Sequence, residues 1–415
     1  MRKRLINLTL RMFARLFPSE RPLLLTGTDS SKQLVSLARA AGAKRTLLVT
    51  EKALVDLGLL DGLLAQFENE GIVVTIFDGI IPNPTYKVIK DGIDVCNASD
   101  SDSVFVVGGG SAIDAAKVIA ACSSARTTVE EVVGLLKVKS VLPFYVVPTT
   151  SGTGSEVTNA AVISETETHQ KKFVVDPKLI PAATALDPKL IKSLPPHITA
   201  ATGMDALTHA IEAYTSVNRF VDAERDAKLA VKLLTEYLPQ AHSQGENLEA
   251  REQVAIGSFL AGYAFNKSGL GYVHAISHQV SAHYNTPHGL ANAVILPRVL
   301  RFIEPVATAR LANLERTITG SEKGRDEELA SQFIERIEAL GREIGIPAHL
   351  EELQEEDFAA IAANARKEAM NFYAVPRLMS AEECTAILAD VAGAAEVAEA
   401  RPNAVPNHTS VAVTH

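Results

Sequence analysis

The hydrophobic pattern of the chain changes once, near residue 190, and this change limits the folds open to it. Before residue 190, short apolar runs such as RTLLVTEK (45–52), GIVVTIFDG (71–79) and DSVFVV (102–107) alternate with segments of helical spacing. Continuous apolar strands between helices are typical of a parallel sheet covered on both faces. After residue 190 the strand-like runs disappear and only helical periodicity continues. The pattern therefore predicts an α/β domain followed by an all-helical domain.

The length of the chain agrees with more than one domain. It has 415 residues, of which 47% are hydrophobic, enough for two cores. We predict the α/β domain over residues 21–190 and the all-helical domain over residues 191–395. Residues 396–415 are rich in Pro, Ala and Asn and have no pattern, which predicts a disordered tail.

Residues 1–20 form a basic extension. On a helical wheel Arg4, Arg11 and Arg15 line a stripe beside an apolar one, and no acid precedes Glu20. Such a short amphipathic helix favours weak contact of residues 1–18 with a membrane surface. The alternative is a helix docked on the domain or on a partner subunit. Arg11 and Arg15 interrupt the apolar run, so the segment is a poor secretory signal.

The composition limits the classes of binding partner and the cellular compartment that suit this chain. The net charge of −9 argues against nucleic acid, because phosphate binding needs a surplus of Lys and Arg. Cys96, Cys122 and Cys384 are widely spaced and odd in number, which indicates a reducing compartment such as the cytoplasm. The sequence contains no apolar run of about 18 residues or more, so it predicts no transmembrane helix.

A glycine turn suggests a phosphate site. Gly108, Gly109 and Gly110 follow a buried strand, and Ser111 opens a helix. Residues without a Cβ let the backbone approach a phosphate, and the helix N-terminus favours its charge. The third spaced glycine of the usual dinucleotide fingerprint is missing. A tight strand-to-helix turn is therefore the alternative.

Two other strand ends support a dinucleotide. Glu51 follows the strand at 45–49, where a carboxylate accepts hydrogen bonds from ribose hydroxyls and repels a 2′-phosphate. Asn83 lies in the rigid turn PNPT, and VVPTTSGTGSEVT (146–158) supplies hydroxyls after another strand. Ligands of open α/β sheets bind at the carboxyl ends of the strands. These strand ends predict NAD binding.

Four of the eleven histidines fall between residues 274 and 288. His274 and His278 are four residues apart, on one face of a helix. Pro287 suits the first turn of a following helix, with Thr286 as its N-cap, so that His288 can point back at His274. His283 faces elsewhere and is expected at the surface or an interface.

An upstream pair completes a ligand set. Asp205 and His209 are also four residues apart, and Glu212 falls on the same face, where we expect it to orient His209. One carboxylate and three imidazoles suit Fe²⁺, Zn²⁺ or another first-row metal. The alternative for each residue alone is a surface hydrogen bond.

This ligand set indicates a reaction. A dication with one carboxylate and three neutral imidazoles has a net charge of about +1, which favours the alkoxide form of an alcohol. The alkoxide can then pass a hydride to a nicotinamide. His278 lies one turn from His274, so it is predicted to relay the proton to solvent.

The motifs resemble the iron-containing (group III) alcohol dehydrogenase family over residues 21–392. The resemblance depends on GGGSAIDAAK (108–117), PTTSGTGSEVT (148–158), TGMDALTHAIEAY (202–214) and GLGYVHAISHQVSAHYNTPHGLANAVILP (269–297). It implies a dinucleotide-binding α/β domain and a helical metal-binding domain, as in dehydroquinate-synthase-like proteins. It also implies a homodimer or larger assembly that acts on an alcohol or aldehyde.

The resemblance also implies roles for single residues. The metal ligands would be Asp205, His209, His274 and His288, with His278 outside the ligand shell. Phe265 would line the alcohol pocket. The residues in contact with NAD would be Glu51, Asn83, Gly110, Ser111, Thr149, Thr150, Thr153 and Lys172.

The sequence departs from the family at three places. Glu51 stands where Asp is frequent, Lys267 where a small or amide residue is common, and NFYAVPRLMS (371–380) where TNPRP is usual. The last two affect the pocket rim and substrate choice. The alternatives are therefore a polyol or lactaldehyde reductase, or a hydroxyacid–oxoacid transhydrogenase for which Lys267 would bind the acid. A lyase of the dehydroquinate-synthase type and a non-catalytic binding protein fit the residues less well.

Overall fold

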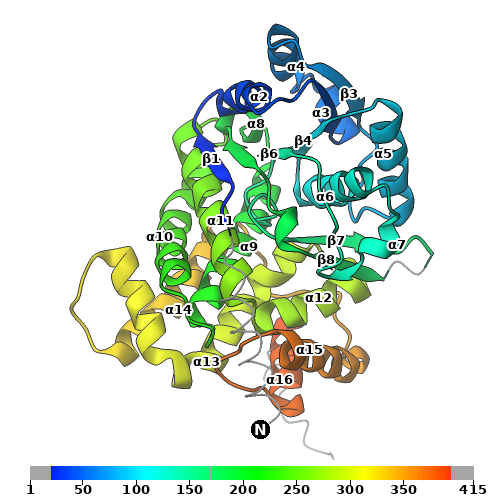
Figure 1. Cartoon of the computed structure of the whole chain (residues 1–415). Coiled ribbons are helices and arrows are strands. Elements are labelled where there is room, and N and C mark those ends of the chain that lie inside the picture. The colour runs from blue at the N-terminus through cyan, green and yellow to red at the C-terminus, as the bar shows by residue number, and fades with distance from the viewer. Residues whose placement is uncertain (1–19, 168–169, 394–415) are drawn as a thin grey trace, which may run out of the picture.

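The computed structural model describes residues 20–167 and 170–393, and its N-terminal part is a parallel sheet covered by helices (Figure 1). In this described part, six strands form one sheet in the order β1-β9-β6-β4-β2-β3, with every pairing parallel. The strands are β1 (Leu23–Thr26), β2 (Arg45–Val49), β3 (Val73–Phe77), β4 (Ser103–Gly108), β6 (Phe144–Pro148) and β9 (Ala183–Leu186). A smaller sheet, ordered β5-β8-β7, contains β5 (Gly134–Leu135), β7 (Ala160–Ser164) and β8 (Lys171–Val175).

Helices cover both faces of the larger sheet, and the strands alternate accordingly. Leu47 and Val49 of β2 enter the core on one face, whereas Leu48 enters the core on the other. This is the two-residue period of a strand that is buried on both sides. The helices of this part are α2 (Ser30–Ala40), α3 (Lys52–Asp56), α4 (Asp61–Asn69), α5 (Tyr86–Ala98), α6 (Gly110–Ala125), α7 (Val129–Val132), the 3₁₀ turn η1 (Pro177–Leu179) and α8 (Pro188–Ile191).

Beyond Leu186 the described chain is helical and packs around one large core (Figure 1). The elements are α9 (Pro196–Thr215), α10 (Val221–Ser243), α11 (Leu248–Ser268), α12 (Tyr272–Tyr284), α13 (His288–Thr319), α14 (Asp326–Glu343), the 3₁₀ turn η2 (Glu355–Asp357), α15 (Phe358–Phe372) and α16 (Ala381–Val391). The α/β and all-helical fold class is thus confirmed. The boundary predicted at residue 190 falls inside α8, and its role as a domain border stays a prediction.

One local prediction was wrong. Helix α13 begins at His288, and Pro287 is its N-cap, without a side-chain capping bond. Thr286 does not cap the helix, because its hydroxyl donates to Glu352 at 2.5 Å. His288 nevertheless lies in the first turn, as expected. The basic helix at 1–18 and the tail at 396–415 lie outside the described residues.

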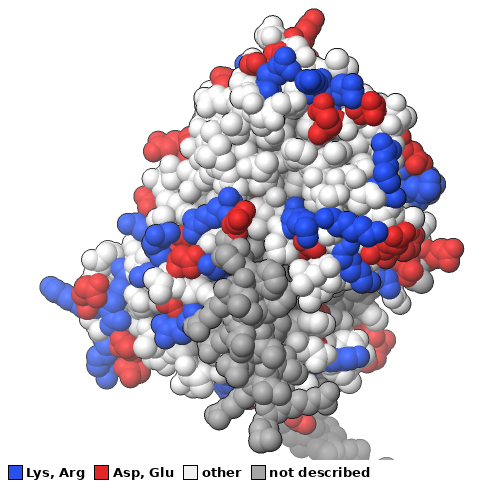
Figure 2. Space-filling model, in the orientation of Figure 1, with Lys and Arg blue, Asp and Glu red and all other residues white. Residues whose placement is uncertain are grey.

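A small apolar cluster joins the two parts. Val157 follows β6, and it packs with Leu186 at the end of β9 and with Phe259 of α11. The carboxyl ends of the strands therefore face the helical part. On the face drawn in Figure 2, Lys and Arg are interspersed with Asp and Glu. Among the described helices, none has both the length and the hydropathy that a bilayer crossing requires.

Candidate metal and nucleotide site

Four predicted ligands converge from three helices. Asp205 and His209 lie on α9, His274 on α12 and His288 in the first turn of α13. The Oδ1 atom of Asp205 lies 3.9, 3.5 and 3.7 Å from the Nε2 atoms of His209, His274 and His288. Asp205, His209 and His274 are buried, whereas the His288 side chain is 36% exposed. The ligand atoms of Asp205, His209 and His274 all lie within 4.8 Å of one another, and the role of the four residues as metal ligands stays a prediction.

Hydrogen bonds behind the cluster orient two of its imidazoles. Glu212 accepts from His274 Nδ1 at 2.7 Å, and also from the backbone N–H groups of Gly271 and Val273. His209 Nδ1 contacts the carbonyl oxygen of Gly152 at 3.2 Å. Both contacts direct Nε2 toward Asp205, as ligand orientation by outer partners requires. The prediction that Glu212 orients His209 was wrong, because the chain reversal at Gly271 brings His274 onto that carboxylate instead.

Asn292 tests whether the cluster fits a cation. Its Nδ2 atom donates to Asp205 Oδ1 at 2.7 Å and lies 3.2 and 3.1 Å from Nε2 of His274 and His288. Its buried Oδ1 atom has no hydrogen-bond partner. The carboxylate oxygen and the two imidazole nitrogens thus converge on one point. A set of N and O donors arranged in this way fits a first-row divalent metal.

The electrostatics of the cluster agree with this fit. Burial raises the pKa of Asp205, but the neighbouring His209, His274 and His288 outweigh it and hold the pKa below its ordinary value. Burial lowers the pKa of His209 to about 4, so that its imidazole is neutral. Burial also opposes the charge on His274, but Glu212 and Asp205 raise its pKa to about 9. Metal binding would therefore displace a proton from His274.

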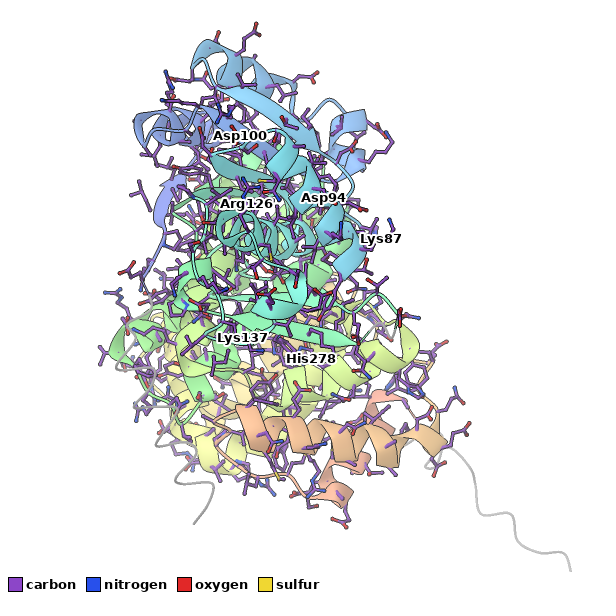
Figure 3. The ribbon with its side chains drawn as sticks, turned by 45° about the vertical axis from the view of Figure 1, so that its right-hand side comes forward. Lys87, Asp94, Asp100, Arg126, Lys137 and His278 are labelled. Atoms are coloured by element: carbon purple, nitrogen blue, oxygen red, sulfur yellow. The ribbon has the colours of Figure 1, made fainter. Side chains whose placement is uncertain are left out.

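His278 lies beside the ligands but is held by a different element. Figure 3 labels it on α12, between the small sheet and α15. Its ring stacks on that of His288 at 5.1 Å and 19°. Its Nδ1 atom contacts Glu368 Oε1 of α15 at 2.6 Å. His283 instead pairs with Asp357 at 3.1 Å with its side chain 50% exposed, as expected of a surface residue.

Two residues of α11 point in different directions. The ring of Phe265 stacks on His209 at 4.3 Å, so it lines the space beside the cluster. The ammonium of Lys267 donates to Asp222 at 2.6 Å and to Tyr263 at 3.3 Å. Residues two positions apart on a helix do not share a face. Lys267 is therefore neutralised by Asp222 and turned away from Phe265.

The predicted nucleotide residues surround the N-terminus of α6. Glu51 accepts from the N–H of Gly109 at 3.1 Å, and burial raises its pKa. A Cβ at Gly108 would lie 2.5 Å from Ala112 Cβ, and one at Gly110 would lie 2.7 Å from Thr153 Cγ2. These close approaches explain why the turn is made of glycine.

The remaining members lie on both sides of this turn. Thr149 donates its N–H to the carbonyl of Gly108 at 3.0 Å, because β4 and β6 are neighbours. Asn83, in the left-handed region with φ 57°, donates its N–H to Ser111 Oγ at 3.4 Å. The strand ends of β2, β4 and β6 thus meet at the carboxyl edge of the sheet, where dinucleotides bind in such folds.

Lys172 is not part of this group. Its ammonium lies 3.6 Å from Glu165 and 3.2 Å from Gln170. The preceding Lys171 reaches Asn83 Oδ1 at 2.5 Å and Ser164 Oγ at 3.3 Å. Successive residues of a strand point to opposite faces, so only one of these two lysines can face the turn. The structure places Lys171 there.

Sequence reasoning missed several residues of the site. Glu368 is separated from His278 by 90 residues, and Asn292 is an amide among apolar neighbours. Gly152 acts through its backbone carbonyl. The first two are ordinary helix residues, so no local signal distinguishes them. Lys171 was detectable only through the exact register of β8.

Two family models match almost the whole described chain. Residues 22–188 match "Iron-containing alcohol dehydrogenase", and residues 199–392 match "Fe-containing alcohol dehydrogenase family, C-terminal". The gap between the matches contains the end of α8 and the start of α9. Both matched segments include residues of the site described above.

Characterised relatives and a solved structure agree with these models. The 1,3-propanediol dehydrogenase of Klebsiella pneumoniae is 39% identical over 91% of this chain and 98% of its own length. The NAD-dependent methanol dehydrogenase of Bacillus methanolicus is 36% identical over 83% of this chain and 91% of its own. The crystal structure of a 1,3-propanediol oxidoreductase superposes with a TM-score of 0.86 at 36% identity, covering 90% of this chain and 99% of that one.

Proposed function

Because this chain belongs to the iron-containing alcohol dehydrogenase family, we propose that it interconverts a primary alcohol and its aldehyde. It is an NAD-dependent enzyme of the iron type, in which a hydride passes between the alcohol carbon and the nicotinamide. The observation that supports this reading best is the convergence of Asp205, His209 and His274 beside the nucleotide loop.

We assign the metal to Asp205, His209, His274 and His288. A divalent iron or zinc ion held there would supply a Lewis acid that stabilises negative charge on the substrate oxygen. The protein residues do the positioning. Glu212 and Gly152 fix the two buried imidazoles, and Phe265 excludes water from one side of His209. His278 accepts the alcohol proton and passes it to solvent, since its side chain is 32% exposed.

We assign the nucleotide to the carboxyl edge of the large sheet. Gly110 and Ser111 would bind the pyrophosphate at the N-terminus of α6, with Asn83 beside them. Glu51 would accept from the ribose hydroxyls once its bond to Gly109 is exchanged. The threonines at 149, 150 and 153 follow β6 on the metal side of this turn. Lys171 replaces Lys172 as the lysine that we assign to the phosphates, because it already contacts Asn83.

We propose an uncharged alcohol as the substrate rather than a hydroxy acid. Lys267, the cation predicted for an acidic substrate, is paired with Asp222. A diol stays compatible with the site because it carries no charge. The transhydrogenase alternative therefore lacks the residue that was predicted to carry it.

One experiment tests the assignment. The purified protein is analysed for bound Fe, Zn and Ni, and NADH formation is recorded with alcohols from ethanol upward and with 1,3-propanediol. We expect His274→Ala to lose both the metal and the activity, and His283→Ala, an exposed neighbour on the same helix, to retain both. Retained metal and rate in His274→Ala would overturn the ligand set. Turnover only with a hydroxy acid and an oxo acid together would favour the transhydrogenase.

The assembly and location are further proposals. We propose a cytoplasmic homodimer; the three cysteines are all buried and unpaired, which suits a reducing compartment. Light scattering coupled to size exclusion tests the dimer. The membrane contact of residues 1–18 is tested by deletion: unchanged liposome binding would exclude it.

A further inference from the structure

A carboxylate on α15 determines which nitrogen of His278 is free. We propose that Glu368 is the positioning residue of His278: it binds the Nδ1 proton and leaves the lone pair on Nε2. The inference rests on the proposed function only in the role given to His278. The tautomer itself is a property of the protein without metal or cofactor. It can therefore be measured independently of the reaction.

Three side chains donate hydrogen bonds to the carboxylate of Glu368. Its Oε1 atom contacts His278 Nδ1 and the hydroxyl of Tyr373, each at 2.6 Å. Its Oε2 atom accepts from Gln279 Nε2 at 2.9 Å. Two donors from α12 and one from the loop after α15 thus converge on one carboxylate. Such charge-assisted bonds are short and strongly directional.

The hydrogen bonds around Glu368 keep its carboxylate ionised. Burial raises its pKa, but the hydrogen bond and charge of His278, with Tyr373 and Gln279, outweigh burial and hold the pKa below its ordinary value. Burial and the charge of Glu368 raise the pKa of Tyr373 well above its ordinary value. The carboxylate is therefore ionised and the phenol protonated. Because an ionised carboxylate only accepts, the hydrogen between Glu368 and His278 belongs to Nδ1.

The same contact excludes the other tautomer of His278, which carries its proton on Nε2. With the proton on Nε2, the Nδ1 lone pair would face a carboxylate oxygen at 2.6 Å. Nothing at this contact could then donate. The ring also cannot turn freely, because it stacks on His288 at 5.1 Å. Glu368 thus selects both the tautomer and the ring orientation, and Nε2 becomes the nitrogen that accepts a proton.

The segment that contains Tyr373 is anchored to the end of α9. Tyr373 lies in the segment 371–380, where the sequence departs from the family pattern. The next residue, Ala374, accepts from the N–H of Val217 at 2.9 Å and from Ser216 Oγ at 3.3 Å. These bonds fix the segment to the end of α9. The phenol therefore holds Oε1 of Glu368, whereas Gln279 holds Oε2.

The test uses ring-nitrogen NMR of the metal-free protein. Histidine labelled with ¹⁵N is incorporated, metal is removed by a chelator, and His278 is assigned by its absence in His278→Gln. At alkaline pH we expect an N–H signature at Nδ1 and a lone-pair signature at Nε2. In Glu368→Met the two signals should move toward each other as the tautomers mix. Glu356→Met, an exposed acid just before α15, should leave them unchanged.

A second variant guards against misfolding. Glu368→Gln retains the volume but is a weaker acceptor, so a smaller shift in the same direction is expected. Unchanged His278 signals in either variant, once circular dichroism shows it folded, overturn the inference. With metal and NAD, we expect kcat of Glu368→Met to fall about 10²-fold, near the lower end for a positioned proton-transfer group. The KM of Glu368→Met should stay unchanged, and Glu368→Asp should recover part of the lost kcat.

The two proposals fail differently. If His278→Gln retains full kcat, the relay role is wrong, while the NMR result still decides the tautomer. If the signals are unchanged in Glu368→Met but His278→Gln is inactive, the relay role survives and the role of Glu368 is refuted. A rise in KM together with a fall in kcat, without recovery by aspartate, would indicate a structural role alone and also refute it.

Discussion

Glu212 is the residue whose replacement tests the construction of the metal site most directly. Its carboxylate is buried, with 6% of the residue exposed. It accepts from Gly271 N–H at 2.8 Å, Val273 N–H at 2.7 Å and His274 Nδ1 at 2.7 Å. All three donors lie around the start of α12. Glu212→Gln preserves the shape and removes both the charge and half of the accepting capacity.

The loss of stability expected in Glu212→Gln follows from the hydrogen bonds that the substitution removes. The new NH₂ group must face at least one of the three donors, so one hydrogen bond disappears and one buried donor loses its acceptor. A hydrogen bond to a charged group contributes about 1.5–3 kcal/mol, and an unsatisfied buried donor costs about 1–3 kcal/mol. We therefore expect the free energy of unfolding to fall by about 2.5–6 kcal/mol. Loss of an outer partner also lowers metal affinity by about 10–100-fold.

Two measurements check this expectation. Urea unfolding of the metal-free protein gives the stability change, and competition with a zinc chelator gives the affinity change. Glu236→Gln, on the exposed face of α10, is the matched control and should change stability by less than about 0.5 kcal/mol. If Glu212→Gln behaves like this control in both assays, Glu212 neither stabilises the turn at Gly271 nor orients His274.

Two more predictions concern charge. In the metal-free protein the lowered pKa of His209, about 4, makes stability rise with pH from about 4 to its unfolded value near 6.5. The raised pKa of His274, about 9, makes stability fall from about 6.5 to 9. Urea unfolding across this range should show a maximum near pH 6.5, and His274→Gln should remove the decline above it; a decline that persists in that variant would assign it elsewhere. Lys171→Met should weaken NADH binding by about tenfold or more, the equivalent of one charge-assisted bond, and Lys172→Met should not; equal effects in a fluorescence titration would contradict the register argument.

Much of the fold was predictable because the pattern of the sequence follows local geometry. The strands β2, β3 and β4 are continuous apolar runs, and buried parallel strands are recognised by this feature. Strand β9 was missed because Ala183–Leu186 is short and rich in small residues, so its pattern resembles a loop. Its partner β1, Leu23–Thr26, was missed for the same reason of length.

Part of the candidate site was likewise predictable from local geometry, and part was not. Ligands four residues apart on one helix, such as Asp205 and His209, follow from helix geometry alone. The partner of His274 does not, because Glu212 reaches it through a chain reversal at Gly271 that only packing decides. Glu368 could not be found at all, since its contact with His278 joins two helices that are far apart in the sequence.

The loop after β6 explains how two separately predicted sites come to act as one. We assign Thr149 and Thr150 to the nucleotide edge, whereas the carbonyl of Gly152, two residues later, contacts Nδ1 of His209. A Cβ at Gly152 would lie 2.7 Å from Thr202 of α9, so the loop reaches this carbonyl contact only because residue 152 is glycine. Hydride transfer needs the nicotinamide and the alcohol within contact distance. The loop after β6 contributes to both proposed sites and adds a hydrogen bond to the apolar packing around Val157, so we expect it to help set the spacing of the reactants.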